Sequence, residues 1–97
     1  MRYKIVLAPE AVEDLRALTA NVRAMLRDAL ETHLRHMPMK TSKSRIKRLR
    51  GLSRPQFRLR VDRVRVYYDV AEDTVEILAI IDKSEADAWL AKMGETQ

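Results

Sequence analysis

Two runs of alternating residues constrain the fold of this chain more than any other feature. Residues 57–61 alternate apolar with charged side chains, and residues 64–70 alternate apolar with mostly polar ones. A period of two is typical of strands that bury one face. The phase changes across Asp62 and Arg63, as it would in a two-residue turn. Residues 57–70 therefore predict an antiparallel β-hairpin with one apolar face.

The other face of this hairpin gathers positive charge. A two-residue turn places Arg60 opposite Arg65 and Arg58 opposite Tyr67. Like charges that face each other destabilise a sheet, and a bound anion would relieve the repulsion. Guanidinium groups bind phosphate oxygens in pairs, and Tyr67 offers a ring on which a nucleobase could stack. The hairpin predicts a phosphate-binding face; the alternative is a solvated face that serves only solubility.

A third strand is expected after the hairpin, because apolar residues alternate again over residues 75–81. In the simplest register Leu78 lies beside Tyr67 and Ile80 lies beside Arg65. Aliphatic side chains would then border the arginine face, which is the hairpin face that carries Arg58, Arg60 and Arg65.

The N-terminal part predicts a strand and two helices. Residues 2–7 alternate well enough for a strand, and Pro9 suits the first turn of a short helix. From Val22 an apolar stripe at helical spacing runs to Met37 and ends before Pro38. Two antiparallel helices are expected across one face of the sheet.

The last residues predict a short closing helix. Ser84 and Asp87 have the spacing of a capping box, Trp89 lies at an apolar position, and Gly94 would end the helix. The expected fold is therefore α+β: a small antiparallel sheet, mixed at its N-terminal strand, with two N-terminal helices on one face and a short C-terminal helix. At 97 residues, we expect a single domain over residues 1–97.

Charge is divided unevenly along the chain, whose net charge is +5. Residues 1–39 hold six basic and five acidic side chains, residues 40–65 hold eleven and one, and residues 66–97 hold two and eight. A cationic block of this kind is typical of a polyanion-binding surface. The segment is mostly loop, with a brief strand expected at residues 47–50. Its predicted nucleic-acid-binding residues are Lys43, Arg45, Lys47, Arg48 and Arg50.

Composition excludes several other classes of function. The chain has no cysteine, which removes disulfides, thiolate metal sites and a cysteine nucleophile. Its apolar N-terminal run is too short for a signal peptide or a membrane span, so we expect a cytoplasmic protein without a membrane partner. His33 and His36 stand three residues apart without a third ligand beside them. We expect neither a metal site nor a cofactor.

The order of these elements, with "RLRGL", "FRLRVDRVRVYYDV" and "VEILAII" in sequence, resembles the RelE/ParE superfamily of bacterial type II toxin-antitoxin toxins. The resemblance covers nearly the whole chain. Its most specific part is residues 48–70, where an L-x-G element precedes a Y/F-R-x-R-x strand and an R-x-x-Y strand.

The resemblance implies a metal-independent, ribosome-dependent endoribonuclease that cleaves messenger RNA in the decoding site. Basic residues on the two strands bind and activate the phosphate in RelE-type members, which implies this catalytic role for Arg58, Arg60 and Arg65. Such members usually add an arginine after the last strand and a proton-transferring tyrosine in the closing helix. This chain reads "IIDKSEADAWL" there, so Lys83 would supply the charge, and nothing clearly supplies the tyrosine.

The resemblance also implies partners. They are an antitoxin encoded by an adjacent gene, which would form a hetero-oligomer with the toxin, and the ribosome with its messenger RNA. We expect the antitoxin to be an acidic segment that folds across the arginine face or displaces the closing helix, with apolar residues over Leu78, Ile80 or the helical pair. Two alternative functions stay open: inhibition of DNA gyrase, as in ParE-type members, and plain nucleic-acid binding.

Overall fold

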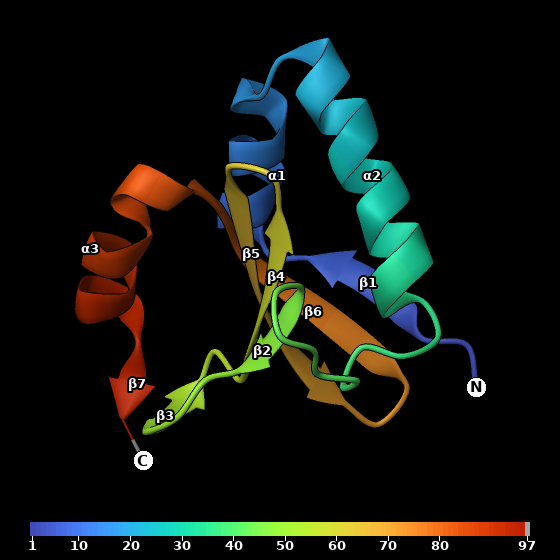
Figure 1. The fold of residues 1–97 in the computed structure, drawn as a ribbon, viewed down its shortest axis with the longest axis vertical. Helices are drawn as coiled ribbons and strands as arrows, with labels where there is room; N and C mark the ends of the chain where they lie inside the picture. Colours follow the sequence, from blue (N-terminus) through green and yellow to red (C-terminus); the bar gives the residue numbers. More distant parts are fainter. Residues whose placement is uncertain (97) are drawn as a thin grey trace.

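The computed structural model describes residues 1–96 and contains a five-stranded sheet with helices on both faces (Figure 1). The elements in chain order are β1 (Lys4–Leu7), α1 (Pro9–Ala17), α2 (Ala20–Leu34), β2 (Ile46–Arg48), β3 (Leu52–Arg54), β4 (Phe57–Val61), β5 (Val64–Ala71), β6 (Thr74–Asp82), α3 (Lys83–Met93) and β7 (Glu95–Thr96). The strand order is β1-β6-β5-β4-β2, with β1 parallel to β6 and the other pairs antiparallel. The predicted α+β architecture is confirmed.

The main hydrophobic core lies between the sheet and the first two helices. The apolar positions of the β4–β5 hairpin pack against Leu26, Leu30 and Leu34 of α2. The rings of Phe57 and Tyr68 stack with 5.5 Å between their centroids. The alternation seen in the sequence therefore has its expected cause, which is burial of one strand face under α1 and α2.

The second helix is shifted relative to its prediction. It begins at Ala20 because the Thr19 hydroxyl accepts a hydrogen bond from the amide of Val22, at 3.4 Å. It ends at Leu34 and not at Met37. The carbonyl of the next residue, Arg35, accepts from the amide of Tyr3 at 2.7 Å, which joins this end of the helix to the N-terminal segment.

The predicted register of the third strand is wrong by one residue. Tyr67 pairs with Ala79 and Arg65 pairs with Ile81, because the β5–β6 ladder shifts between Tyr67 and Tyr68. Near this bulge the amide of Ile80 donates to Asp14 of α1, at 2.9 Å.

Leu78 and Ile80 are both buried in this conformation, and contact of a partner with Leu78, Ile80 or the helical pair stays a prediction. An alternating sequence pattern does not reveal a bulge, which explains the error in the predicted register of the third strand.

The closing helix α3 lies on the face of the sheet opposite α1 and α2 (Figure 1). It begins at Lys83, because the carboxylate of Asp82 accepts from the amide of Ser84 at 3.0 Å and so takes the capping role predicted for Ser84. It ends as predicted at Gly94, whose amide donates to the carbonyl of Leu90 at 2.8 Å. No helix within residues 1–96 is long and apolar enough to span a membrane.

Candidate functional site

The candidate site lies on the sheet face that α3 partly covers. Arg60 pairs with Arg65 and Arg58 pairs with Tyr67, as the hairpin pattern predicted. The edge strand β2 adds Lys47 beside Arg58. The expected strand at residues 47–50 is therefore present but begins one residue earlier and ends sooner.

A cleft of about 470 Å³ opens between this face and α3. Four of its lining residues are basic and come from four different elements: Lys47 of β2, Arg58 of β4, Arg65 of β5 and Lys83 of α3. Three of the four predicted catalytic residues thus meet around one space. Sequence reasoning missed Asp87, which lines the same cleft; its spacing of four residues from Lys83 on a helix was the available signal.

The guanidinium of Arg65 is held beside the hairpin turn. Its Nη1 donates to the carbonyl oxygen of Asp62 at 2.7 Å and to that of Val64 at 3.3 Å. Asp62 adopts a left-handed φ of 53°, which aspartate tolerates in a tight turn. Burial lowers the pKa of Arg65, and the neighbouring charges of Arg58 and Arg60 lower it further. This crowding of like charge favours binding of an anion.

Arg58 contributes an unused hydrogen-bond donor. Its Nε is buried and has no partner within residues 1–96. A buried donor without a partner costs free energy, so this atom does not stabilise the fold. None of the ion pairs within residues 1–96 involves Arg58, Arg60 or Arg65.

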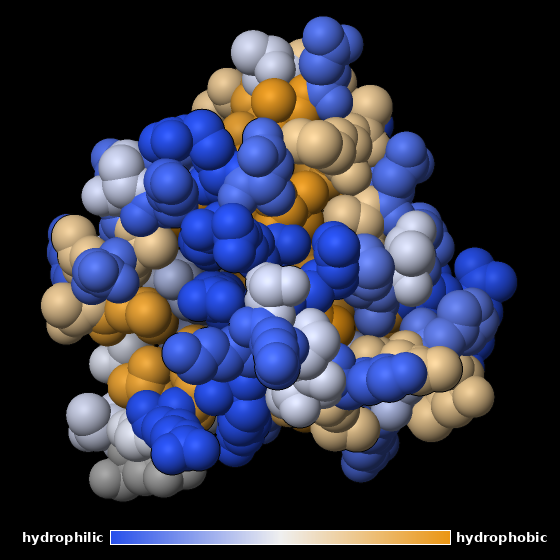
Figure 2. All heavy atoms as spheres, in the orientation of Figure 1, coloured by the Kyte–Doolittle hydropathy of each residue, from blue (hydrophilic) through white to orange (hydrophobic). Residues whose placement is uncertain are grey.

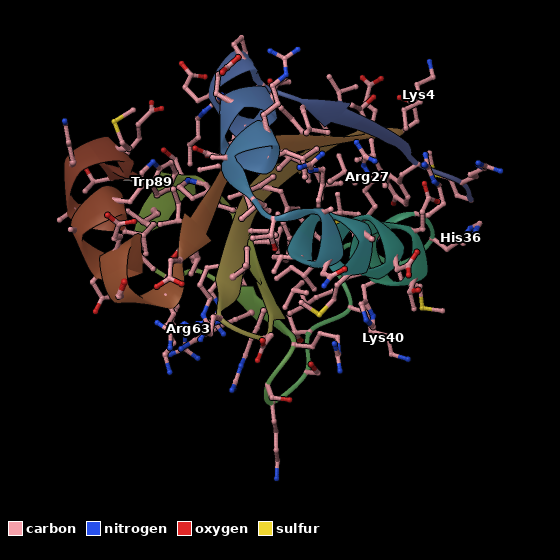
Figure 3. All side chains as sticks on the ribbon, turned by 90° about the horizontal axis from the view of Figure 1, so that it is seen from above. Lys4, Arg27, His36, Lys40, Arg63 and Trp89 are labelled. Carbon is pink, nitrogen blue, oxygen red and sulfur yellow. The ribbon has the colours of Figure 1, made fainter. Side chains whose placement is uncertain are left out.

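The position of Lys83 follows from contacts at the start of α3. Its amide donates to the carbonyl of Arg63 at 2.7 Å, and the Arg63 guanidinium pairs with Asp82 at 3.2 Å. Hydrogen bonds from Ser84, and then from Arg63, lower the pKa of Asp82 to about 2. Figure 3 shows Arg63 on the α3 side of the hairpin. The hairpin turn and α3 are therefore joined where Lys83 enters the cleft.

Tyr67 does not present an open ring for a nucleobase, contrary to the prediction. Only 1% of the residue is exposed, and its ring stacks on Trp89 with 4.9 Å between centroids and 16° between planes. Burial raises the pKa of the Tyr67 hydroxyl. Ala79 and Ala86 complete this small second core, into which Trp89 points from α3 (Figure 3). The expectation failed because the sequence does not show which sheet residue a closing helix will cover.

The other predicted residues are more dispersed. Arg60 is exposed and faces Arg65, but it does not line the cleft. Arg48 lies over the ring of Phe57, with 5.2 Å from its guanidinium carbon to the ring centroid, and therefore faces the side of α1 and α2. Lys43, Arg45 and Arg50 are exposed, Lys43 and Arg50 on loops and Arg45 directly before β2. Figure 2 shows hydrophilic side chains gathered over the region between α3 and α2.

Part of the cationic block is neutralised within the protein. The guanidinium of Arg54 lies within 3.7 Å of carboxylate oxygens of Asp69, Glu76 and Glu95. These contacts tie the β3 region to β5, β6 and the C-terminal segment. Arg54 therefore contributes to the fold. The charge available to a polyanion is that of the cleft and of the β2 edge, whose exposed cations include Lys43, Arg45 and Lys47.

A family model described as the ParE toxin of the type II toxin-antitoxin system parDE matches residues 5–87. The chain belongs to this toxin family. The predicted membership of the RelE/ParE superfamily is thereby confirmed, and the protein is a toxin of a type II toxin-antitoxin system. No curated protein sequence matches the toxin.

Solved structures show the same fold at low identity. The RelBE2 toxin-antitoxin complex of Mycobacterium tuberculosis has a TM-score of 0.66 and 23% identity, covering 84% of this toxin and 99% of that chain. The archaeal RelE-RelB complex of Pyrococcus horikoshii has a TM-score of 0.64 and 24% identity, covering 86% and 97%. A mutant of the toxin RelE from E. coli, in the free state, has a TM-score of 0.69 and 19% identity, covering 96% and 99%.

Proposed function

We propose that this toxin cleaves messenger RNA on the ribosome without a metal ion, and that the cleft beneath α3 holds the scissile phosphate. The convergence of Lys47, Arg58, Arg65 and Lys83 on one space carries the proposal. Guanidinium and ammonium groups keep their charge at working pH and match a phosphodiester in sign and hydrogen bonding. The likeness to RelE structures agrees with this activity.

The chemistry is a transfer within the RNA backbone. The ribose 2′-oxygen bonds to the adjacent phosphorus and the bond from phosphorus to the 5′-oxygen breaks, which leaves a 2′,3′-cyclic phosphate and a 5′-hydroxyl. Arg58 and Arg65 stabilise the negative charge that grows on the phosphoryl oxygens. Lys83 donates a proton to the leaving oxygen, because an arginine does not give up its proton. Arg60, exposed beside them, adds to the positive field that attracts the strand.

Asp87 accepts the proton of the attacking 2′-hydroxyl in this scheme. It is the one carboxylate that lines the cleft within residues 1–96, and a general base must lie within reach of the proton that it removes. Asp87→Asn should slow RNA cleavage at least about 100-fold while RNA binding is retained. Glu85→Gln, an exposed change on α3 outside the cleft, is the matched control. Equal cleavage rates for the two variants would remove Asp87 from the mechanism.

The partner that we propose is an acidic antitoxin encoded by an adjacent gene. Related structures are antitoxin-toxin complexes, and the exposed cations of the β2 edge match an acidic chain. The antitoxin would cover the arginine face or displace α3, which would uncover Tyr67 and Trp89.

Inhibition of DNA gyrase is the second candidate. The family model is described by its ParE members, and the cleft contains no accessible tyrosine within residues 1–96, since Tyr67 is covered by Trp89. On this alternative the toxin inhibits gyrase by binding, and the cationic cleft catalyses no reaction.

Expression of the toxin without a partner in growing bacteria separates these functions. We expect growth arrest in which protein synthesis stops and cellular messages are cut while DNA stays intact. Early DNA breaks that depend on gyrase, with protein synthesis continuing, would favour the second candidate. Normal growth at confirmed levels of folded protein would leave only plain nucleic-acid binding.

A further inference from the structure

A second concave site lies beside the edge strand β2, where the loop after α2 enters the sheet. This groove has a volume of about 470 Å³, and none of the acidic residues within residues 1–96 lines it. The residues that matter for its chemistry are His33, His36, Met37, Lys40, Arg45 and Ile46. The groove thus combines cationic groups with two imidazole rings and an apolar surface. Sites for single-stranded nucleic acid join a positive groove to rings on which bases stack.

The cations of the groove are not used by the fold. Lys40 and Arg45 are exposed and take part in none of the ion pairs within residues 1–96. The Ser42 hydroxyl accepts from the amide of Arg45 at 3.0 Å, which shapes the loop that carries both residues. Cations near a helix C-terminus often offset the helix dipole, but Lys40 and Arg45 lie beyond the end of α2.

The environment of His33 shows the sign of the local field. Burial lowers the pKa of His33, and the charge of Arg45 lowers it further. Within residues 1–96 the charge that shifts this pKa is that of Arg45, so its contribution to the field at His33 is positive. Such a field attracts an anion to the same place.

The groove and the cleft lie on the two sides of the edge strand β2. Ile46 lines the groove and the next residue, Lys47, lines the cleft, because successive strand residues point to opposite faces. The carbonyl of Arg45 accepts from the amide of Arg60 at 2.8 Å, which places Arg45 beside the arginine pair of the hairpin. Figure 3 shows His36 and Lys40 near the C-terminal end of α2, away from Trp89.

We propose that this groove binds the single-stranded RNA that continues beyond the cleft. Lys40 and Arg45 would contact phosphates, while Met37, which is 57% exposed, offers an apolar surface to a base. The inference rests on the proposed function, because the bound segment is the continuation of the strand held in the cleft. A single strand fits better than a duplex, whose bases are paired and stacked and cannot reach an apolar floor.

The test compares RNA of two lengths whose 2′-hydroxyls are methylated, so that they cannot be cleaved. A trinucleotide reports the cleft alone, and a strand of about ten nucleotides can also reach the groove. We expect the longer strand to bind the wild-type toxin several-fold more tightly. Lys40→Gln should remove most of that gain, and it should reduce the slope of log affinity against log salt by about 0.7, the value for one phosphate contact on a single strand.

Lys4→Gln is the matched control, because it removes the same charge from β1 at the opposite edge of the sheet. An equal gain with length in Lys40→Gln and Lys4→Gln would overturn the inference. So would a Lys40→Gln variant that binds an acidic antitoxin more weakly but keeps the full gain with length, since the groove would then serve a protein partner. Binding of methylated RNA needs no cleavage, so failure of the proposed nuclease function would be seen separately, as intact messages in expressing cells.

Discussion

Arg65 faces Arg60 across the hairpin and lines the cleft. Its hydrogen bonds to the turn are offset by repulsion from Arg58 and Arg60, so Arg65→Ala should change the free energy of unfolding by less than about 1 kcal/mol. Cleavage of ribosome-bound message should nevertheless be lost, because charge on the phosphate would no longer be stabilised.

Thermal unfolding and a cleavage assay on the same preparation check this expectation. Arg27→Ala, an exposed change on α2, removes the same charge and should leave cleavage intact. Arg65→Lys should restore little, because an ammonium lacks the two-pronged geometry of a guanidinium. An Arg65→Ala variant that unfolds, or that cleaves at the wild-type rate, would contradict the role given to Arg65.

The stack of Trp89 on Tyr67 is one of the contacts that hold α3 on the sheet. Trp89 is the only tryptophan, so its fluorescence reports whether the helix is docked on Tyr67. Tyr67→Ala should shift the emission to longer wavelength and lower the free energy of unfolding by about 3 kcal/mol, since it leaves a cavity. Tyr67→Phe retains the ring and should leave the emission nearly unchanged. Identical spectra for all three proteins would show that the stack does not hold α3.

The start of α3 predicts a dependence on pH. The pKa of Asp82 is about 2, below its ordinary 3.8, so its contribution to stability is complete above about 3.8 and is lost as the pH falls through about 2. Asp82→Asn should therefore destabilise the protein at neutral pH and weaken the dependence of unfolding on pH in the acidic range. Trp89 fluorescence during acid titration measures this dependence of unfolding on pH, and Asp28→Asn on α2 is the control. An acid transition that is unchanged in Asp82→Asn would contradict the role given to the ionised carboxylate of Asp82.

Local patterns in the sequence predicted the elements well and their tertiary contacts less well. The phase change at Asp62 and Arg63 located the hairpin turn and hence the pairing of Arg60 with Arg65, because alternation is a direct consequence of burial. The bulge after Tyr67 and the cover that Trp89 places over it depend on packing between distant elements, which periodicity does not encode. The basic residues of the cleft were predicted as site residues. Asp87, which lines the cleft with them, was not, because its place depends on how α3 packs on the sheet.

At the scale of the whole molecule, the uneven charge predicts how an antitoxin binds. Exposed cations at the β2 edge should steer an acidic partner, so raising the salt concentration should slow association more than it speeds dissociation. Binding kinetics of the toxin and the product of the adjacent gene, at low and high salt, measure both rates. An association rate that is indifferent to salt would remove electrostatic masking of this surface as the means of inhibition.

We assign RNA cleavage to the cleft between the sheet and α3. The most direct test incubates the purified toxin with ribosomes stalled on a defined message and determines where the RNA is cut and which chemical ends it carries. We predict cuts at fixed codon positions with 2′,3′-cyclic phosphate and 5′-hydroxyl ends, without added metal and only when ribosomes are present. A message that stays intact in the presence of folded toxin, or is cut to leave other ends, would show that the toxin does not cleave RNA in this way.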